Sequence, residues 1–211
     1  MVKKAQGARD FAALLRQVRA CRVCAAHLPL GPRPVLQASP AAQLVIVGQA
    51  PGTRVHESGV PWDDASGARL RDWLGLAPEV FYDETKIALV PTGFCYPGRL
   101  PRGGDAPPRP ECAPLWHPPL FAAMTGIRLT LAVGGHAQAR LLAGRSRTGP
   151  RASVTATVAA WRDTLPQIIP LPHPSWRTTG WEKRNPWFAA ELLPEVRRRV
   201  RAVLAGPEDG T

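Results

Sequence analysis

Four short apolar runs constrain what this chain can fold into more than any other feature. Each is four or five residues long and is continuous rather than alternating, and the runs are residues 44–47, 87–90, 129–133 and 168–171. Strands of this kind are typical of a parallel sheet that is covered on both faces. We therefore expect the core to form around four such strands.

Helix-like segments separate these runs. They span residues 68–76, 114–124, 136–142 and roughly 188–204, and an amphipathic helix is expected within residues 1–20. This alternation predicts an α/β fold, a three-layer α/β/α sandwich with a central four-stranded, mainly parallel sheet. A chain of 211 residues without internal repeats is expected to form a single domain over residues 1–211.

Three segments lack a clear helical or strand pattern. Residues 96–110 are too rich in Pro and Gly for either element and predict a long loop between Cys95 and Cys112. Residues 144–157 look loose and basic, and residues 206–211 are expected to form a frayed tail.

The chain carries a large excess of positive charge. Its 27 Lys and Arg residues against 16 Asp and Glu residues give a formal net charge of +11. This excess suits a polyanionic partner such as nucleic acid. The alternative is a solvated basic surface without a partner, since part of the arginine content fits the general Ala, Arg, Pro and Gly bias of the chain.

The sequence gives no sign of a membrane segment. No run of eighteen apolar residues occurs, and the N-terminal segment has two lysines but no continuous apolar core before a cleavage site. We therefore expect a cytoplasmic protein that does not bind a membrane.

Four cysteines are present and suggest one shared site. Cys21 and Cys24 form a C-x2-C pair, and Cys95 and Cys112 follow far along the chain. A reducing compartment argues against structural disulfides, and four thiolates are a full ligand set for a [4Fe-4S] cluster or a tetrahedral zinc ion. The distant second pair favours the cluster over zinc, because zinc sites more often use two close pairs. Four unrelated buried cysteines remain the alternative.

The first apolar run leads into the turn GQAPG, residues 48–52. Gly48 and Gly52 permit a close backbone approach, and Pro51 stiffens the turn. The loops after the first, second and fourth runs carry GQAPG, PTGFCYPG and PHPSW. Because the carboxyl ends of parallel strands share one edge of a sheet, these loops are expected to converge on a ligand site. Taken alone, a turn with Gly and Pro is common and weak evidence.

A tryptophan and two aspartates follow the turn. Trp62 is placed to stack on a flat base, with core packing as the alternative. Asp64 or Ser66 is placed to cap the next helix, whose N-terminus suits a phosphate. Capping is also the alternative reading of Asp63.

Together these motifs resemble one known family. The string GQAPGTRVHESGVPWDDASGARL is similar to the first motif of the iron–sulfur-containing bacterial and archaeal members (family 4/5-like) of the uracil-DNA glycosylase superfamily. The string HPS at residues 173–175 is similar to the second motif, and the cysteine spacing is similar to that of the cluster ligands in those families. The resemblance covers roughly residues 20–190.

The resemblance implies a monofunctional DNA glycosylase that flips uracil out of DNA and hydrolyses its N-glycosidic bond, leaving an abasic site. A neutral His173 would stabilise the departing uracil anion. The resemblance further implies a monomer, a [4Fe-4S] cluster or zinc on the four cysteines, and a uracil-containing DNA partner, single- or double-stranded. The residues expected to bind substrate are Gly48, Ala50, Pro51, Gly52, Trp62, Ser66, Gly67, Ser175 and Arg177.

The first motif departs from the family pattern. Gln49 occupies the catalytic position where the iron–sulfur families have a glutamate, and neither Gln49 nor Ala50 can act as a base. Asp63 is the first candidate for the missing acid; further candidates are Asp64, His56, Glu57 and Asp105. Catalysis without a protein base is the alternative, since DNA phosphates and anion stabilisation lower the barrier as well.

The residues expected to recognise the base also depart from the family pattern. The loop after the second run has no Asn, and the only Asn of the chain is Asn185. Backbone groups are therefore expected to read uracil, or recognition extends to hypoxanthine and xanthine. No KRRIH-like insertion is visible, which disfavours covalent attachment to DNA.

The segment WRTTGWEKRNPWF after HPS is expected to enter the DNA groove through Trp176, Arg177 and Trp181. Core packing is the alternative for Trp181 and Trp187.

Two other functions compete with the glycosylase. One is a non-catalytic relative that recognises damaged DNA, which the missing carboxylate favours. The other is a zinc-stabilised small-molecule hydrolase, for which no nucleophile or histidine cluster is visible.

Overall fold

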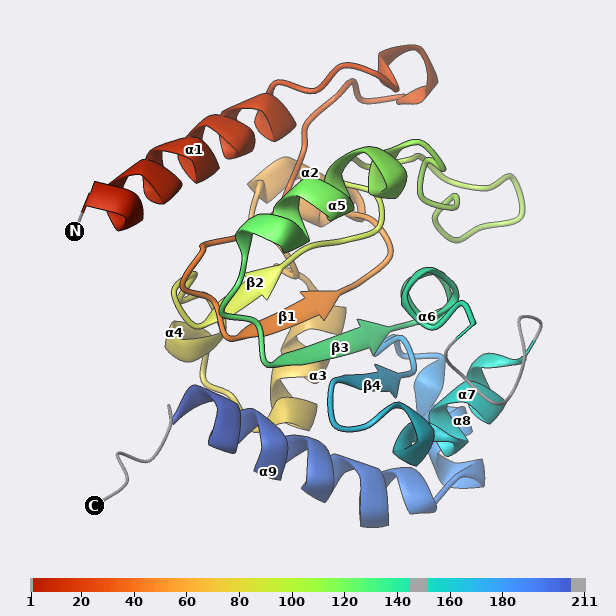
Figure 1. Cartoon of the computed structure of the whole chain (residues 1–211). Helices are drawn as coiled ribbons and strands as arrows, with labels where there is room; N and C mark the ends of the chain where they lie inside the picture. The colour runs from red at the N-terminus through yellow and green to blue at the C-terminus, as the bar shows by residue number, and fades with distance from the viewer. Residues whose placement is uncertain (1, 145–151, 206–211) are drawn as a thin grey trace, which may run out of the picture.

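The centre of the molecule is a four-stranded parallel sheet. The structure is a computed structural model and describes residues 2–144 and 152–205. Its strands are β1 (Leu44–Val47), β2 (Ile87–Leu89), β3 (Leu129–Val133) and β4 (Ile168–Leu171). They lie in the order β2-β1-β3-β4, and every neighbouring pair is parallel (Figure 1). All four strands therefore end at the same edge of the sheet.

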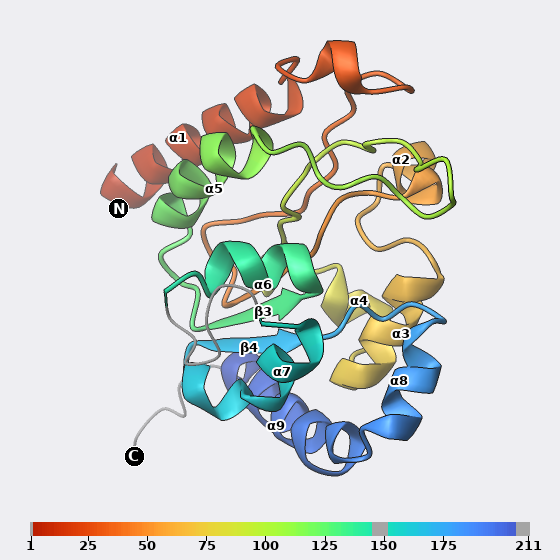
Figure 2. The ribbon, with the colours of Figure 1, turned by 90° about the vertical axis from the view of Figure 1, so that its right-hand side faces the viewer.

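Helices cover both faces of this sheet. Helices α1 (Val2–Arg19), α5 (Cys112–Ala123) and α6 (Gly135–Leu141) lie on one side, and α3 (Ala65–Leu74) and α9 (Leu193–Leu204) lie on the other (Figures 1 and 2). This arrangement confirms the predicted α/β fold with a parallel four-stranded sheet flanked by helices. The shorter elements are α2 (Thr53–Ser58), α4 (Pro78–Phe81), α7 (Val154–Ala159), α8 (Thr178–Arg184), two 3-10 helices (Ala25–His27 and Trp161–Thr164) and a π-helix (Phe188–Leu192).

The strands are apolar on both faces because each face meets its own core. Leu44 and Ile46 pack with α3 and α9, whereas Val45 and Val47 pack with α1, α5 and α6. Successive side chains of a strand point to opposite faces, so both sets must be apolar. All four of these β1 side chains are buried, which explains the continuous apolar run.

The element boundaries differ from the predicted ones in a few places. Helix α3 begins at Ala65 rather than at residue 68, and the last predicted helix begins with a π-helical turn before α9. The short helices α2, α4, α7 and α8 were not predicted, and α7 begins within the segment expected to be loose, residues 144–157. Residues 145–151 of that segment and the predicted tail (206–211) fall outside the described residues. In the part that the structure describes, no helix is long and apolar enough to cross a membrane.

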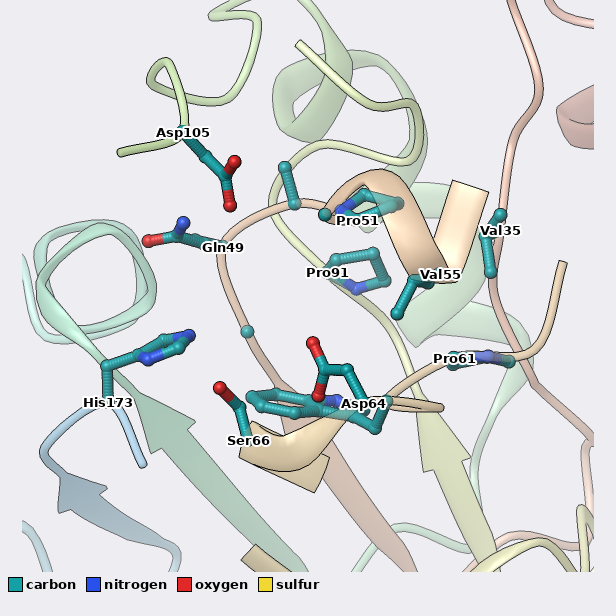
Figure 3. A pocket seen from close by; sticks show the side chains of 14 residues that line it. Val35, Gln49, Pro51, Val55, Pro61, Asp64, Ser66, Pro91, Asp105 and His173 are labelled. Atoms are coloured by element: carbon teal, nitrogen blue, oxygen red, sulfur yellow. The ribbon is translucent and has the colours of Figure 1, made fainter. Parts of the chain in front are cut away.

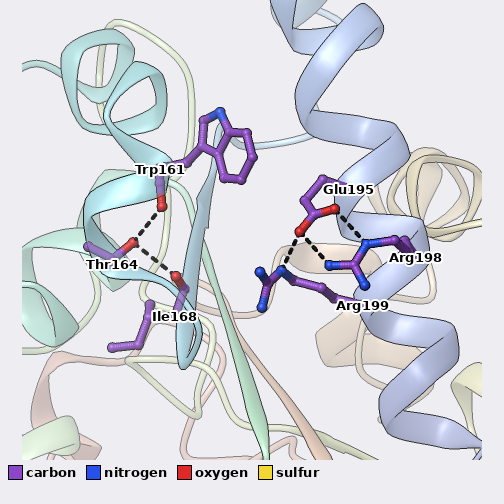
Figure 4. Close-up of polar contacts among 6 residues, drawn as sticks. All are labelled: Trp161, Thr164, Ile168, Glu195, Arg198 and Arg199. Carbon is purple, nitrogen blue, oxygen red and sulfur yellow. Dashed lines mark hydrogen bonds and ion pairs between the residues drawn. The ribbon is translucent and has the colours of Figure 1, made fainter.

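Two arginines of α9 make contrasting contacts. Arg197 reaches α3, where its Nε donates to the carbonyl of Trp73 (3.0 Å) and its Nη2 donates to the carbonyl of Asp72 (3.1 Å). Arg197 thereby pairs the carbonyl of Trp73 at the end of α3 and adds a second donor to the carbonyl of Asp72, which also accepts from the amide of Gly75 (3.1 Å). Arg198 instead binds Glu195 one turn earlier on α9, at 2.7 Å (Figure 4).

Figure 4 also shows Thr164, whose hydroxyl contacts the carbonyls of Trp161 and Ile168 at the start of β4.

We predict that Arg197→Ala destabilises the protein more than Arg198→Ala. The first change leaves the carbonyl of Trp73 without its arginine donor and should lower the free energy of unfolding by about 1–3 kcal/mol. The second removes one pair in which the arginine is 59% exposed, worth at most about 1 kcal/mol. Urea unfolding of both variants measures the difference, and equal losses would contradict the assigned role of Arg197.

Candidate active site

A pocket lies at the carboxyl edge of the sheet. Its empty volume, open mouth included, is about 580 Å³. The lining comes from the GQAPG turn after β1, from Pro91 after β2, from His173 after β4 and from the start of α3 (Figure 3). The loops that were expected to converge on one edge do meet at this pocket.

Trp62 forms the floor of the pocket. A Cβ atom on Gly48 would lie 2.7 Å from Cζ2 of Trp62, so only glycine lets the indole lie against the end of β1. The backbone of Trp62 has a positive φ of 59°, which is rare for a bulky residue. Its carbonyl accepts a hydrogen bond from Tyr82 Oη (3.3 Å). Trp62 both lines the pocket and packs against the core, so the two sequence readings are compatible.

The start of α3 is capped by Asp64. Its Oδ1 accepts from the backbone N–H of Gly67 at 2.7 Å. A Cβ on Gly67 would lie only 1.8 Å from the carbonyl oxygen of Trp62, so the residue must be glycine. Gly67 is buried and its amide is already used, while Ser66 lines the pocket. Of the two residues expected to bind phosphate here, Ser66 is thus the one that lines the pocket.

His173 faces the pocket beside Trp62. The two ring centroids lie 5.9 Å apart with an angle of 30° between the planes. The carbonyl of His173 is held by the amide of Ser175 (2.8 Å) and by the hydroxyl of Thr178. Burial lowers the pKa of His173, and this effect is opposed by the charges of Asp64 and Asp105. The imidazole is therefore neutral at pH 7 and can donate a hydrogen bond.

Two carboxylates line the pocket, but the predicted one does not. Asp64 and Asp105 belong to the lining, whereas Asp63 is absent from it. The charge of Asp63 acts on Tyr82 and contributes to the raised pKa of that phenol, which is due first to burial. Of the candidate acids, Asp64 and Asp105 are therefore the ones that line the pocket.

Asp105 reaches the pocket from the long loop. The loop forms a tight hairpin, in which the amide of Leu100 donates to the carbonyl of Gly104 (2.9 Å) and the amide of Ala106 donates to the carbonyl of Gly98 (2.8 Å). Asp105 Oδ2 lies 3.6 Å from where a Cβ of Gly52 would be. Figure 3 shows its carboxylate above Gln49, across the pocket from Asp64.

Gln49 has a fixed backbone and a side chain in the pocket. Its carbonyl accepts hydrogen bonds from the amide of Gly93 and the hydroxyl of Thr92, both at 2.7 Å. Its carboxamide lies between Asp105 and His173 (Figure 3). A carboxamide donates and accepts hydrogen bonds but does not take up a proton at pH 7. Ala50, Pro51 and Gly52 complete this side of the lining.

Arg69 on α3 holds the segment that follows β4. Its Nη1 donates to the carbonyl of Ser175 (3.0 Å) and to the hydroxyl of Thr179 (2.9 Å), and its Nη2 binds Glu182 at 2.8 Å. Ser175 itself is not part of the pocket lining. The structure therefore assigns Ser175 a place in the support of His173.

The segment that follows His173 carries an exposed tryptophan. Trp176 is 78% exposed, and the guanidinium of Arg177 lies 5.4 Å from the centre of its ring. Arg177 also reaches the hairpin, where its Nη1 lies 3.9 Å from a Cβ position of Gly104. In contrast, Trp181 and Trp187 pack against the core, and Trp181 Nε1 donates to Thr155 Oγ1 at 2.7 Å. The packing alternative is correct for Trp181 and Trp187.

All four cysteines line a second cavity. The amide of Phe94 donates to Sγ of Cys112 at 3.3 Å. Burial raises the pKa of Cys95 to about 11 and that of Cys112 to about 12. A metal group bound here would have to displace these thiol protons. Within the described residues, no group of three or more His, Cys, Asp or Glu side chains has the geometry of a metal site.

Some lining residues were not predicted. Val35 lies outside every predicted element, and Val55 belongs to the unpredicted helix α2. Pro91 directly follows the second apolar run and could have been found from its place at a strand end. Thr92 is buried and anchors the GQAPG turn through hydrogen bonds to the carbonyls of Gly48 (2.8 Å) and Gln49.

A comparison with known families gives one match. The sequence model of the uracil DNA glycosylase superfamily matches residues 37–197 of this chain. The matched region contains the sheet, the lining of the pocket except Val35, and the second cysteine pair, Cys95 and Cys112.

We predict that Arg69→Met loosens the segment behind His173. Loss of the three contacts should lower the free energy of unfolding by about 1–3 kcal/mol and speed amide exchange over residues 174–182. Hydrogen–deuterium exchange measures this effect. The matched control is Arg184→Met, which changes an exposed arginine of α8. Equal exchange over residues 174–182 in both variants would refute the role of Arg69.

Proposed function

Since the chain belongs to the uracil DNA glycosylase superfamily, whose members act on DNA, we propose that it is a monofunctional glycosylase that excises uracil and leaves an abasic site. The observation that carries the proposal is one pocket that combines the Trp62 floor, a neutral His173 and two carboxylates. A base inside a duplex is unreachable, so the target nucleotide must be flipped into the pocket. Trp62 then offers a flat surface on which the base stacks.

His173 stabilises the leaving group. When the N-glycosidic bond breaks, its electron pair stays on the base, which becomes an anion. The ring N–H of a neutral imidazole can donate a hydrogen bond to this anion. Removal of one such donor typically costs about 10²–10³ in rate.

Asp105 supplies the carboxylate that the first motif lacks. The sugar gains positive charge as the base leaves, and a carboxylate nearby stabilises it and accepts a proton from the attacking water. Asp64 is less suited to this role, because one of its oxygens caps α3. Asp105 is exposed in the free protein, and DNA bound over the mouth of the pocket would cover it.

Gln49 and the backbone of the GQAPG turn read the base edge. The carboxamide can pair with the adjacent carbonyl and N–H groups of uracil. The same pair of groups occurs in hypoxanthine and xanthine, which are therefore the alternative substrates. We expect Trp176 and Arg177 after His173, together with Arg99 and Arg102 on the hairpin, to contact the DNA strand, so affinity should fall steeply with salt.

The four cysteines hold a [4Fe-4S] cluster, with zinc as the alternative. All four residues share one cavity, and Cys95 and Cys112 flank the loop that carries Asp105. The bound group supplies a structural anchor, since hydrolysis needs no electrons. The pocket is complete within one chain, which supports a monomer, and we place the enzyme in the cytoplasm.

A second candidate function rests on Gln49. Without a carboxylate in the first motif, the chain could recognise damaged DNA without cleaving it. The two remaining carboxylates at the pocket favour catalysis instead.

We predict that Asp105→Asn and His173→Ala each lower single-turnover excision of uracil by about 10²–10³. Asp63→Asn is the matched control, because Asp63 does not line the pocket, and it should stay within about threefold of wild type. Labelled oligonucleotides that carry uracil, hypoxanthine or xanthine measure the rates after alkaline cleavage. A severe loss in Asp63→Asn with normal Asp105→Asn would overturn this assignment. Binding without cleavage would support the non-catalytic reading.

We also predict that Cys95→Ser lowers the iron content and removes the brown colour. It should lower the melting temperature by several degrees, because both ends of the Asp105 loop lose their anchor. Metal analysis of anaerobically purified protein separates iron from zinc. Wild-type iron content in the variant would exclude Cys95 as a ligand.

A further inference from the structure

The cysteine cavity contains two donors that the protein leaves unpaired. Four buried side-chain nitrogens within the described residues have no hydrogen-bond partner, and two of them, Arg109 Nε and Trp116 Nε1, belong to residues that line this cavity. The other two belong to His56 and His117, which do not line it. Buried donors are nearly always paired, so two orphans at one cavity indicate acceptors that a bound group would supply.

The surrounding contacts fit a group with sulfur acceptors. The amide of Phe94 already donates to Cys112 Sγ at 3.3 Å. The thiol of Cys24 donates to Glu111 at 3.8 Å, and Glu111 is paired with Arg109 Nη2 at 2.8 Å. Arg109 therefore has its terminal nitrogen engaged and its Nε free for the cavity.

We propose that Arg109 Nε and Trp116 Nε1 donate hydrogen bonds to sulfur atoms of the cluster held by the four cysteines, and so set its reduction potential and its resistance to loss. The inference rests on the proposed [4Fe-4S] cofactor. Hydrogen bonds to the sulfurs are among the factors that set cluster potentials. Because reduction adds negative charge, such donors stabilise the reduced state more and raise the potential.

The test uses two conservative variants of the whole chain, reconstituted without oxygen. Trp116→Phe removes the indole N–H and keeps an aromatic ring, and Arg109→Lys removes Nε and keeps the charge. Trp187→Phe is the matched control, since Trp187 packs in the core on the opposite face of the sheet. The readouts are the one-electron midpoint potential and the half-life of the brown absorbance in air.

Each donor variant should lower the midpoint potential. The equilibrium between oxidised and reduced cluster should shift about three- to tenfold toward the oxidised form, where tenfold is about 59 mV for one electron. The absorbance of each donor variant should also decay at least about twofold faster, while Trp187→Phe matches wild type. Wild-type potential and half-life in both donor variants would overturn the proposal. Wild-type protein that takes up zinc or no metal would overturn it as well. Uracil excision by the same samples decides the glycosylase separately, because cleavage in a cluster-free protein would leave that function standing.

Discussion

The contact between Trp62 and Gly48 is the constraint on which the pocket depends. The indole lies against the backbone where β1 ends, and the carbonyl of the same residue lies against Gly67 at the start of α3. A side chain at either glycine would push Trp62 away. The positive φ of Trp62 is kept by these neighbours and by the hydrogen bond from Tyr82. One residue thereby joins the end of β1 to the start of α3, where Asp64 lines the pocket.

The long loop joins the two candidate sites. It begins at Cys95 and ends at Cys112, both of which line the cysteine cavity, and between them Asp105 reaches the pocket. A group bound by the cysteines would restrict both ends of a segment that has few buried contacts of its own. Such a group would therefore act through the position of Asp105. Arg69 has the matching role on the other side, where it ties the segment after His173 to α3.

Much of the fold could be predicted from the sequence because its strands are buried on both faces and read as continuous apolar runs. The shared edge of the strands then placed the GQAPG turn and His173 together. The sequence could not predict which of the neighbouring carboxylates, Asp63 or Asp64, lines the pocket. That depends on the positive φ of Trp62 and on the extended backbone of Asp64. Trp176 and Trp181 are also alike in sequence terms, yet one is exposed and the other packs on the core. Only tertiary contacts distinguish such pairs.

The pH dependence of single-turnover uracil excision tests the central claim most directly. That claim is that a neutral His173 donates a hydrogen bond to the leaving base. Because burial lowers the pKa of His173 from its ordinary value of 6.5, the imidazole is neutral above that pH and becomes charged only at lower pH. The account predicts a rate constant that is level above about pH 6.5 and falls on the acid side as His173 gains a proton. A rate that rises toward acid pH would show that imidazolium is the active form, and no excision at any pH would contradict the assignment as a glycosylase.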